Sequence, residues 1–101
     1  MTQRHVQHFV IELRDGDIAT VSFKGRDAWA LSQLIAAGER GCTPIDHPGP
    51  RWSGYVHKLR RAGIAVETRT EAHGGAFAGH HARYILRSHV RLALHSDAEA
   101  A

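Results

Sequence analysis

Residues 50–64 read PRWSGYVHKLRRAGI, and this stretch is predicted to form an amphipathic helix over residues 51–62. At about 100° per residue, its large apolar side chains fall on one narrow arc, the pattern of a helix packed against a core. These side chains are Trp52, Tyr55, Val56 and Leu59. Gly63 stands where a left-handed residue ends a helix, and Ile64 after it is expected to cover the last turn.

The opposite arc of the same helix is cationic and contains small residues. Its members are Arg51, Ser53, Gly54, His57, Lys58 and Arg61. A cationic helical face is often only a solvated surface, so its meaning depends on the elements around it. Arg60 lies near the boundary of the two arcs, and it is expected to cover Trp52 or to pair with an acidic side chain.

Length and composition indicate one globular domain. With 101 residues, of which 43% are hydrophobic, the chain can bury one modest core. No run approaches the roughly 20 apolar residues that cross a bilayer. The opening residues, MTQRHVQH, lack the apolar centre of a secretory signal. We therefore expect a cytoplasmic protein without a membrane segment.

The charge and the residue types favour some classes of function and exclude others. The formal net charge is +3, and most of the 13 basic residues are arginine. Arginine suits phosphates and guanine edges, although an arginine excess also follows from GC-rich coding. Cys42 is the only cysteine, which excludes an intrachain disulfide and a cysteine-built zinc site. It is expected to be buried rather than reactive.

We find no arrangement typical of catalysis. The sequence shows no nucleophile beside a base, no paired carboxylates and no glycine loop with phosphate-binding spacing. We therefore expect no enzymatic activity, no cofactor and no small-molecule substrate.

The N-terminal segment, residues 5–24, is predicted to form a β-hairpin. Asp15-Gly16 lies between two β-rich runs and suits a tight turn, which places strands near residues 7–13 and 18–23. Alternate residues share a side of a strand, so four apolar side chains line one face: Phe9, Ile11, Val21 and Phe23. A lone hairpin is marginal in water, so this one must pack on the rest of the domain.

Two further helices are predicted before residue 50. The first covers residues 26–37 and ends at Gly38, with a core face formed by Ala28, Leu31, Leu34 and Ile35. Trp29 lies almost opposite this face and is expected to be covered by the N-terminal hairpin. The second, at residues 43–47, has Thr43 as its cap and is limited to about one turn by Pro48. Gly49-Pro50 then resets the chain direction.

The region after Gly63 is predicted to form a second β-hairpin. IAVETRT (residues 64–70) and ARYILRS (residues 82–88) are strand-like and flank a glycine-rich tip. Ile64, Val66 and Thr68 share one face, as do Tyr84 and Leu86 on the returning strand. Residues 89–101 alternate at first and then turn small and acidic, which predicts a short strand against the N-terminal hairpin followed by a frayed tail.

This order of elements resembles the winged helix-turn-helix fold. The residues that carry the resemblance are the GCTPIDHP entry to the second helix, RWSGYVHKLRRAGI, and the strands IAVETRT and ARYILRS. The resemblance covers about residues 26–88. More narrowly, the chain is similar to small winged-helix proteins of phage and prophage type. The expected fold is a single α+β domain of residues 1–101, with a three-helix core, a C-terminal β-hairpin wing and the additional N-terminal hairpin.

The resemblance implies sequence-specific binding of double-stranded DNA by a transcriptional regulator of the bacterial nucleoid. The helix at 51–62 would enter the major groove, and the wing at 71–83 would follow the backbone. Carried over by position, the DNA-facing residues are Arg51, Ser53, Gly54, His57, Lys58 and Arg61 on the helix and Arg69 and Arg83 on the wing. Because some winged helices bind proteins, the alternative is an interaction or homodimerisation module without DNA binding, in which a hairpin edge accepts another strand.

Three wing histidines, His73, His80 and His81, lie near Glu71 in the sequence. A metal centre needs three or four convergent donors on rigid support, and a glycine-rich tip supplies little rigidity. We expect these histidines to form hydrogen bonds across the turn, or to contact phosphate when protonated, and no metal to be bound.

Overall fold

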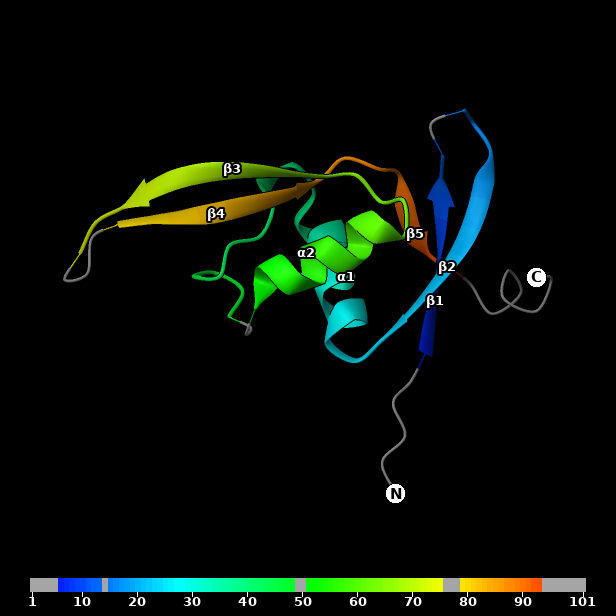
Figure 1. Cartoon of the computed structure of the whole chain (residues 1–101), viewed down its shortest axis with the longest axis horizontal. Coiled ribbons are helices and arrows are strands. Elements are labelled where there is room, and N and C mark those ends of the chain that lie inside the picture. The colour runs from blue at the N-terminus through cyan, green and yellow to red at the C-terminus, as the bar shows by residue number, and fades with distance from the viewer. Residues whose placement is uncertain (1–5, 14, 49–50, 76–78, 94–101) are drawn as a thin grey trace, which may run out of the picture.

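Two helices lie between a three-stranded sheet and a two-stranded sheet (Figure 1). This computed structural model describes residues 6–13, 15–48, 51–75 and 79–93. In chain order the elements are β1 (Val6–Glu12), β2 (Ile18–Lys24), α1 (Gly25–Ala37), the 3₁₀ turn η1 (Gly38–Arg40), α2 (Trp52–Arg61), β3 (Val66–His73), β4 (Gly79–Leu86) and β5 (Val90–Leu92).

The predicted N-terminal hairpin is confirmed. β1 and β2 pair antiparallel with Phe9 opposite Val21, and both Phe9 and Ile11 are fully buried against α1. Gly16 has φ 91°, a left-handed value that favours glycine at this turn. The predicted short C-terminal strand is confirmed as β5, which pairs with the other edge of β1. Residues 94–101, predicted to be frayed, lie outside the described residues.

The first helix agrees with its prediction in extent and in buried face. Ala28, Leu31 and Leu34 are buried, and Gly38 ends α1 with φ 58°. The ring of Trp29 packs on α2, with centroids 5.6 Å from Trp52 and 6.4 Å from Tyr55, whereas the sequence predicted the N-terminal hairpin as its cover. Packing between the two helices therefore depends on a cluster of aromatic rings.

The predicted second helix does not form, so the predicted three-helix core is wrong. Thr43 does act as a cap, because its Oγ1 accepts a hydrogen bond from the Asp46 N–H at 3.0 Å. The N–H of His47 donates to the Thr43 carbonyl at 2.8 Å, which completes one turn. Pro48 cannot donate a backbone hydrogen bond, and the turn does not propagate. The described part of the chain contains two α-helices, and residues 49 and 50, predicted to redirect the chain, are outside it.

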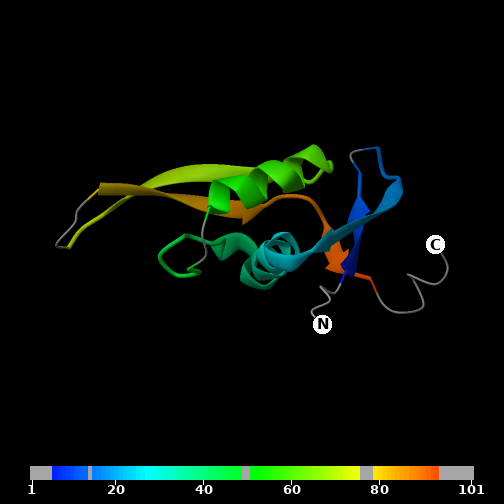
Figure 2. The same cartoon turned by 60° about the horizontal axis from the view of Figure 1, so that its bottom comes forward.

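The predicted wing is confirmed as the β3–β4 hairpin, which projects away from the helices (Figure 2). Its pairing runs from Val66 opposite Leu86 to His73 opposite Gly79, so the strands extend further into the glycine-rich stretch than predicted. Of this stretch, residues 76–78 lie outside the described part. Cys42 and Tyr84 exchange two backbone hydrogen bonds of 2.8 Å, which bind the segment after η1 to β4.

No helix among the described residues is long and apolar enough to cross a membrane.

Candidate nucleic-acid interface

The buried side of α2 is the one predicted from its periodicity. Trp52, Tyr55, Val56 and Leu59 are all buried. The Trp52 ring stacks on Tyr84 of the wing, with centroids 5.8 Å apart and planes at 15°, so this one side chain positions α2 against β4. Its Nε1 also donates a 2.7 Å hydrogen bond to the His47 carbonyl, which fixes the start of the helix.

Both ends of α2 are set by residues in left-handed backbone conformations. Arg51 precedes the helix with φ 64° and ψ 48°, and no side chain caps this end. Gly63 has φ 99°, and the Ile64 N–H returns to the Leu59 carbonyl at 3.1 Å, as predicted for a helix terminator. Ile64 is 2% exposed, so it covers the last turn as expected.

All six contact residues predicted on and directly before α2 are exposed. They form what we call the cationic face: Arg51, Ser53, Gly54, His57, Lys58 and Arg61. Among the described residues, the side chains of Arg51, His57 and Arg61 have no hydrogen-bond or ion-pair partner. An unpaired guanidinium keeps its donors available for phosphate or for a guanine edge.

Lys58 is the member of the cationic face with an acidic partner. Its Nζ lies 3.3 Å from Asp27 Oδ2 of α1, but 63% of the Lys58 side chain remains exposed. Exposed ion pairs of this kind contribute little to stability, about 1 kcal/mol at most. The pair therefore does not remove Lys58 from the surface.

Arg26, at the start of α1, extends this surface and was not predicted. Its guanidinium lies 4.2 Å from the centroid of the Trp29 ring, and its Nε donates to the Tyr55 hydroxyl at 3.4 Å. The only sequence signal is the three-residue spacing from Arg26 to Trp29, which places both on one side of α1. The sequence does not show that this side of α1 lies next to the cationic face, because that depends on how α1 packs on α2.

Arg60 departs from its prediction. Rather than covering Trp52 or meeting an acid, its Nη2 donates to the Val66 carbonyl at 2.7 Å and to Thr68 Oγ1 at 2.8 Å. The guanidinium therefore links α2 to β3, and it is not available as an unpaired cation.

One face of the wing carries a ladder of alternating charges. Glu67, Arg69 and Glu71 lie two residues apart on β3, so their side chains share a face. Arg69 Nε contacts Glu67 Oε2 at 2.7 Å, and Arg83 on β4 reaches Glu71 Oε2 at 2.5 Å. We call the set Glu67, Arg69, Glu71, Arg83 and Arg87 the wing ladder.

The wing ladder also holds the wing against the turn that follows α1. Arg83 Nη1 donates to the Arg40 carbonyl at 2.7 Å, and Arg87 bridges Glu67 and Glu39. Hydrogen bonds from Arg69 and Arg87 keep the pKa of the Glu67 carboxyl below the ordinary value of 4.5, and the hydrogen bond from Arg83 does the same for Glu71. The same contacts with carboxylates raise the pKa of Arg83 and Arg87. Arg69 and Arg83, predicted as DNA contacts, are thus paired with acids, and Arg83 does not join the cationic face.

Two of the three wing histidines, His73 and His81, interact across the hairpin, as predicted. His73 Nδ1 and His81 Nδ1 are 2.9 Å apart, and His81 Nε2 lies 3.1 Å from Glu71 Oε1. His80 lies at an exposed position and, being one residue from His81, on the opposite face of β4. No group of three or more metal-binding side chains with suitable geometry occurs within the described ranges.

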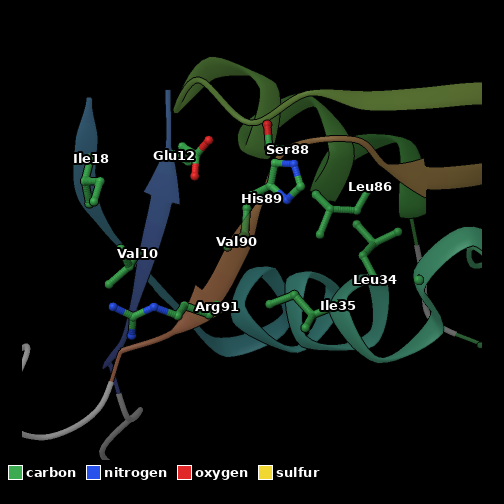
Figure 3. A pocket seen from close by; sticks show the side chains of 11 residues that line it. Val10, Glu12, Ile18, Leu34, Ile35, Leu86, Ser88, His89, Val90 and Arg91 are labelled. Atoms are coloured by element: carbon green, nitrogen blue, oxygen red, sulfur yellow. The ribbon is translucent and has the colours of Figure 1, made fainter. Parts of the chain in front are cut away.

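A pocket of about 390 Å³ opens between the N-terminal sheet and the C-terminal half of α1 (Figure 3). Its walls include Leu34, Ile35 and Leu86, with His89 and Glu12 among its polar lining. The Glu12 N–H donates to the His89 carbonyl at 3.0 Å, which holds the end of β1 beside the residue that precedes β5. The pocket includes no residue of the cationic face.

Comparison with protein families identifies a winged-helix match. The family model described as a winged helix domain matches residues 20–96, which covers α1, α2, both wing strands and β5. Comparison with curated proteins and with solved structures gives no match.

Proposed function

Because this chain belongs to the winged-helix family, we propose that it is a non-enzymatic, sequence-specific DNA-binding protein that regulates transcription. α2 enters the major groove of double-stranded DNA through its cationic face, and the wing lies along the flanking backbone. The observation that carries the proposal is that His57 and Arg61 on α2, and Arg51 directly before it, are exposed and have no hydrogen-bond or ion-pair partner among the described residues.

The arrangement supplies the two kinds of contact that DNA recognition needs. Cations at the ends of the face, Arg51 and Arg61, suit phosphates on either side of a groove, which position a protein but carry no sequence information. Ser53 and His57 lie between them and can form hydrogen bonds with base edges. Sequence preference therefore depends mainly on the short polar side chains, and overall affinity on the arginines.

Gly54 supports a close approach of a ligand to the backbone of α2. A Cβ added there would meet only the Arg51 Cβ, at 3.9 Å, so nothing in the fold requires glycine. Glycine in a helix is less favourable than alanine by up to about 1 kcal/mol. A glycine that the fold does not need, at the centre of an exposed face, is explained by a partner that passes close to the helix.

The charge distribution on the wing limits its role. Its arginines are paired with Glu67 and Glu71, so the wing contributes fewer free cations than the helix. In this proposal the outer wing supplies Arg69, whose side chain is 56% exposed, and Arg83 serves as a structural link.

The proposal is tested by titrating labelled duplex DNA of mixed sequence and following fluorescence anisotropy. Binding at low salt should weaken by at least about tenfold between about 50 mM and about 200 mM salt, because each neutralised phosphate releases counterions. Arg61→Ala should lower the affinity by about five- to tenfold and reduce the salt slope by about 1. Selection from a random duplex library should then enrich a defined motif.

Arg40→Ala is the matched control. It removes the same group from η1, which packs against β4, and it leaves the cationic face intact. Its effect on affinity should be less than about twofold. The proposal is wrong if Arg61→Ala and Arg40→Ala weaken binding equally, or if the triple change of Arg51, Lys58 and Arg61 to alanine leaves binding unchanged.

A protein-interaction module is the second candidate function. The observation that favours it is the wing ladder, which neutralises most of the wing's cations and would be expected on a surface that faces another protein. Absence of duplex binding at low salt, with an intact fold, would select this candidate.

A further inference from the structure

β2 is an edge strand whose outer side is unpaired within the described residues. The sheet order is β2-β1-β5, so β2 pairs with β1 along one side only, and Figure 1 shows β2 crossing β1 and leading directly into α1. All seven β2 residues pair with β1 in continuous register, from Ile18 opposite Glu12 to Lys24 opposite Val6. Half of its backbone donors and acceptors therefore point away from β1 with no strand to receive them.

β2 lacks the features that usually protect an edge strand. Its sequence, IATVSFK, contains no proline, and its one charged residue, Lys24, is at the end. Soluble proteins commonly protect such edges with inward charges, prolines or bulges. The core-facing side chains Ala19, Val21 and Phe23 are only partly buried, so apolar surface remains along the edge. Ile18 is 70% exposed.

We propose that the β2 edge is a homodimerisation surface, on which two copies pair antiparallel around a two-fold axis at Val21. The seven-residue strand then places Val21 opposite its own copy, Thr20 opposite Ser22, Ala19 opposite Phe23 and Ile18 opposite Lys24. In this register the hydroxyls of Thr20 and Ser22 are opposite each other, the small Ala19 is opposite the large Phe23, and no two like charges are opposite each other. The three-stranded sheets become one continuous sheet of six strands.

Charge complementarity favours a second copy in this antiparallel orientation. The turn before β2, RDGD (residues 14–17), has a net negative charge, and β2 ends with the basic Lys24. In the two-fold pair, the acidic turn of each copy lies beside the basic end of the other. A parallel pair would instead bring acid against acid and base against base. Exposed Ile18 would lie over the aliphatic part of Lys24 of the second copy.

The pair forms a closed dimer, since an antiparallel two-fold contact uses the same edge on both copies and leaves none for a third. The surface is separate from the cationic face, so the dimer does not depend on DNA binding. If the protein binds DNA as proposed above, the dimer would present two copies of α2 and favour target sites with inverted symmetry.

Sedimentation velocity over a range of protein concentrations tests the dimer. Wild type should show a reversible monomer–dimer equilibrium. Thr20 is exposed, and in the dimer its two copies lie diagonally across the axis. Thr20→Lys should raise the dissociation constant by at least about fivefold, because it places two like charges near each other. Thr20→Glu should weaken the dimer less, because the new carboxylate also lies diagonally from Lys24 of the second copy, and an equimolar mixture of the two variants should dimerise at least as well as wild type.

Thr70→Lys is the matched control, since Thr70 is an exposed threonine on β3 of the wing. It should leave the dissociation constant within about twofold of wild type. Circular dichroism and thermal unfolding should show that all variants keep the fold. A chain that stays monomeric up to near-millimolar concentration, or a dimer that responds equally to Thr20→Lys and Thr70→Lys, overturns the proposal.

Cysteine crosslinking tests the register independently. Val21→Cys places two thiols directly opposite each other at the axis, and mild oxidation should give a covalent dimer. Ile18→Cys lies opposite Lys24 of the other copy and should crosslink at least about tenfold more slowly. Equal crosslinking at both positions would indicate a parallel pair, and none at Val21→Cys would indicate another surface. Either result rejects the arrangement proposed here.

Discussion

Lys58 Nζ on α2 lies 3.3 Å from Asp27 Oδ2 on α1, so one acid beside the cationic face opposes its charge. Asp27 is in the first turn of α1, where a carboxylate also interacts favourably with the helix dipole. The same side chain therefore stabilises the fold and weakens the field that would attract a polyanion.

We predict that Asp27→Asn increases duplex affinity by about two- to fivefold at low salt, because it removes one negative charge beside the proposed interface. The cost should be about 0.5–1 kcal/mol in the free energy of unfolding, from the lost exposed ion pair and helix-dipole contact. Anisotropy titration and urea denaturation measure the two effects. Glu12→Gln, an equal charge change on β1, should leave the affinity unchanged. A loss of affinity in Asp27→Asn would contradict the prediction.

Gly54 and Gly63 should respond oppositely to alanine. Gly54→Ala should keep or raise stability, by up to about 1 kcal/mol, because the added Cβ meets only a carbon at 3.9 Å. It should nonetheless weaken duplex binding severalfold by blocking close approach to the helix. Gly63→Ala should cost about 1 kcal/mol or more, because its φ of 99° is strained for alanine. The folded fraction of Gly63→Ala should bind as wild type does. If Gly54→Ala binds duplex DNA as well as wild type does, the DNA does not need to approach the backbone of α2 closely at Gly54.

Protonation of the Glu67 and Glu71 carboxylates in the wing ladder should lower the stability of the fold in acid. Hydrogen bonds from arginines keep the pKa of Glu67 and Glu71 below the ordinary value of 4.5. A carboxyl with a lowered folded-state pKa stabilises the fold fully above its unfolded value, and that contribution is lost as pH falls through the folded value. The urea midpoint should therefore decrease below about pH 4.5.

The double variant Glu67→Gln with Glu71→Gln provides the control for this pH dependence. It should be less stable than wild type at neutral pH and should show a shallower decrease in acid, because the two linked protonation sites are gone. Identical acid slopes in wild type and variant would show that other carboxyls dominate.

Cys42 should be unreactive in the folded protein. Its side chain is fully buried, and burial raises the pKa of the thiol to about 11, so the nucleophilic thiolate is scarce near neutral pH. Iodoacetamide at mildly alkaline pH should modify the native protein at least about a hundredfold more slowly than the protein in urea, with mass spectrometry as the readout. Rapid modification of the native protein would show that the segment from Gly41 to Thr43 opens readily.

Gly41→Ala should be among the most destabilising small substitutions. A Cβ at Gly41 would lie 2.5 Å from the Tyr84 carbonyl oxygen and 2.8 Å from Ile85 Cγ1, and the backbone φ is 71°. We expect a loss of about 2–4 kcal/mol in the free energy of unfolding, measured by urea denaturation. Gly38→Ala, which has a similar φ of 58° but no atom within 4 Å, separates backbone strain from collision and should cost about 1 kcal/mol. Equal losses would rule out the collision.

The sequence predicted the features that follow from local periodicity. The buried arc of α2, the glycine that ends it and the face of the N-terminal hairpin all depend on spacing within one element. The predicted second helix failed because one cap and one turn of hydrogen bonds could not continue past Pro48.

The partners of individual arginines could not be predicted in this way. Arg60 finds the Val66 carbonyl, and Arg83 finds both Glu71 and the Arg40 carbonyl. These contacts depend on strand register and on packing between elements distant in sequence, and any exposed cation has several acceptors within reach. The six residues of the cationic face were found because they lie on or directly before one helix, and Arg26 was missed because it is on another helix.

Tyr84 joins the wing to two parts of the domain: its backbone pairs with Cys42 in the segment after η1, and its ring stacks on Trp52 at the start of α2. The position of α2 relative to the wing is thus held by ring stacking on a residue whose backbone is itself paired. For a protein that binds duplex DNA as proposed, adaptation to different targets must come from the nucleic acid. Its groove width and flexibility, at steps that no side chain touches, would then contribute to which sites are preferred.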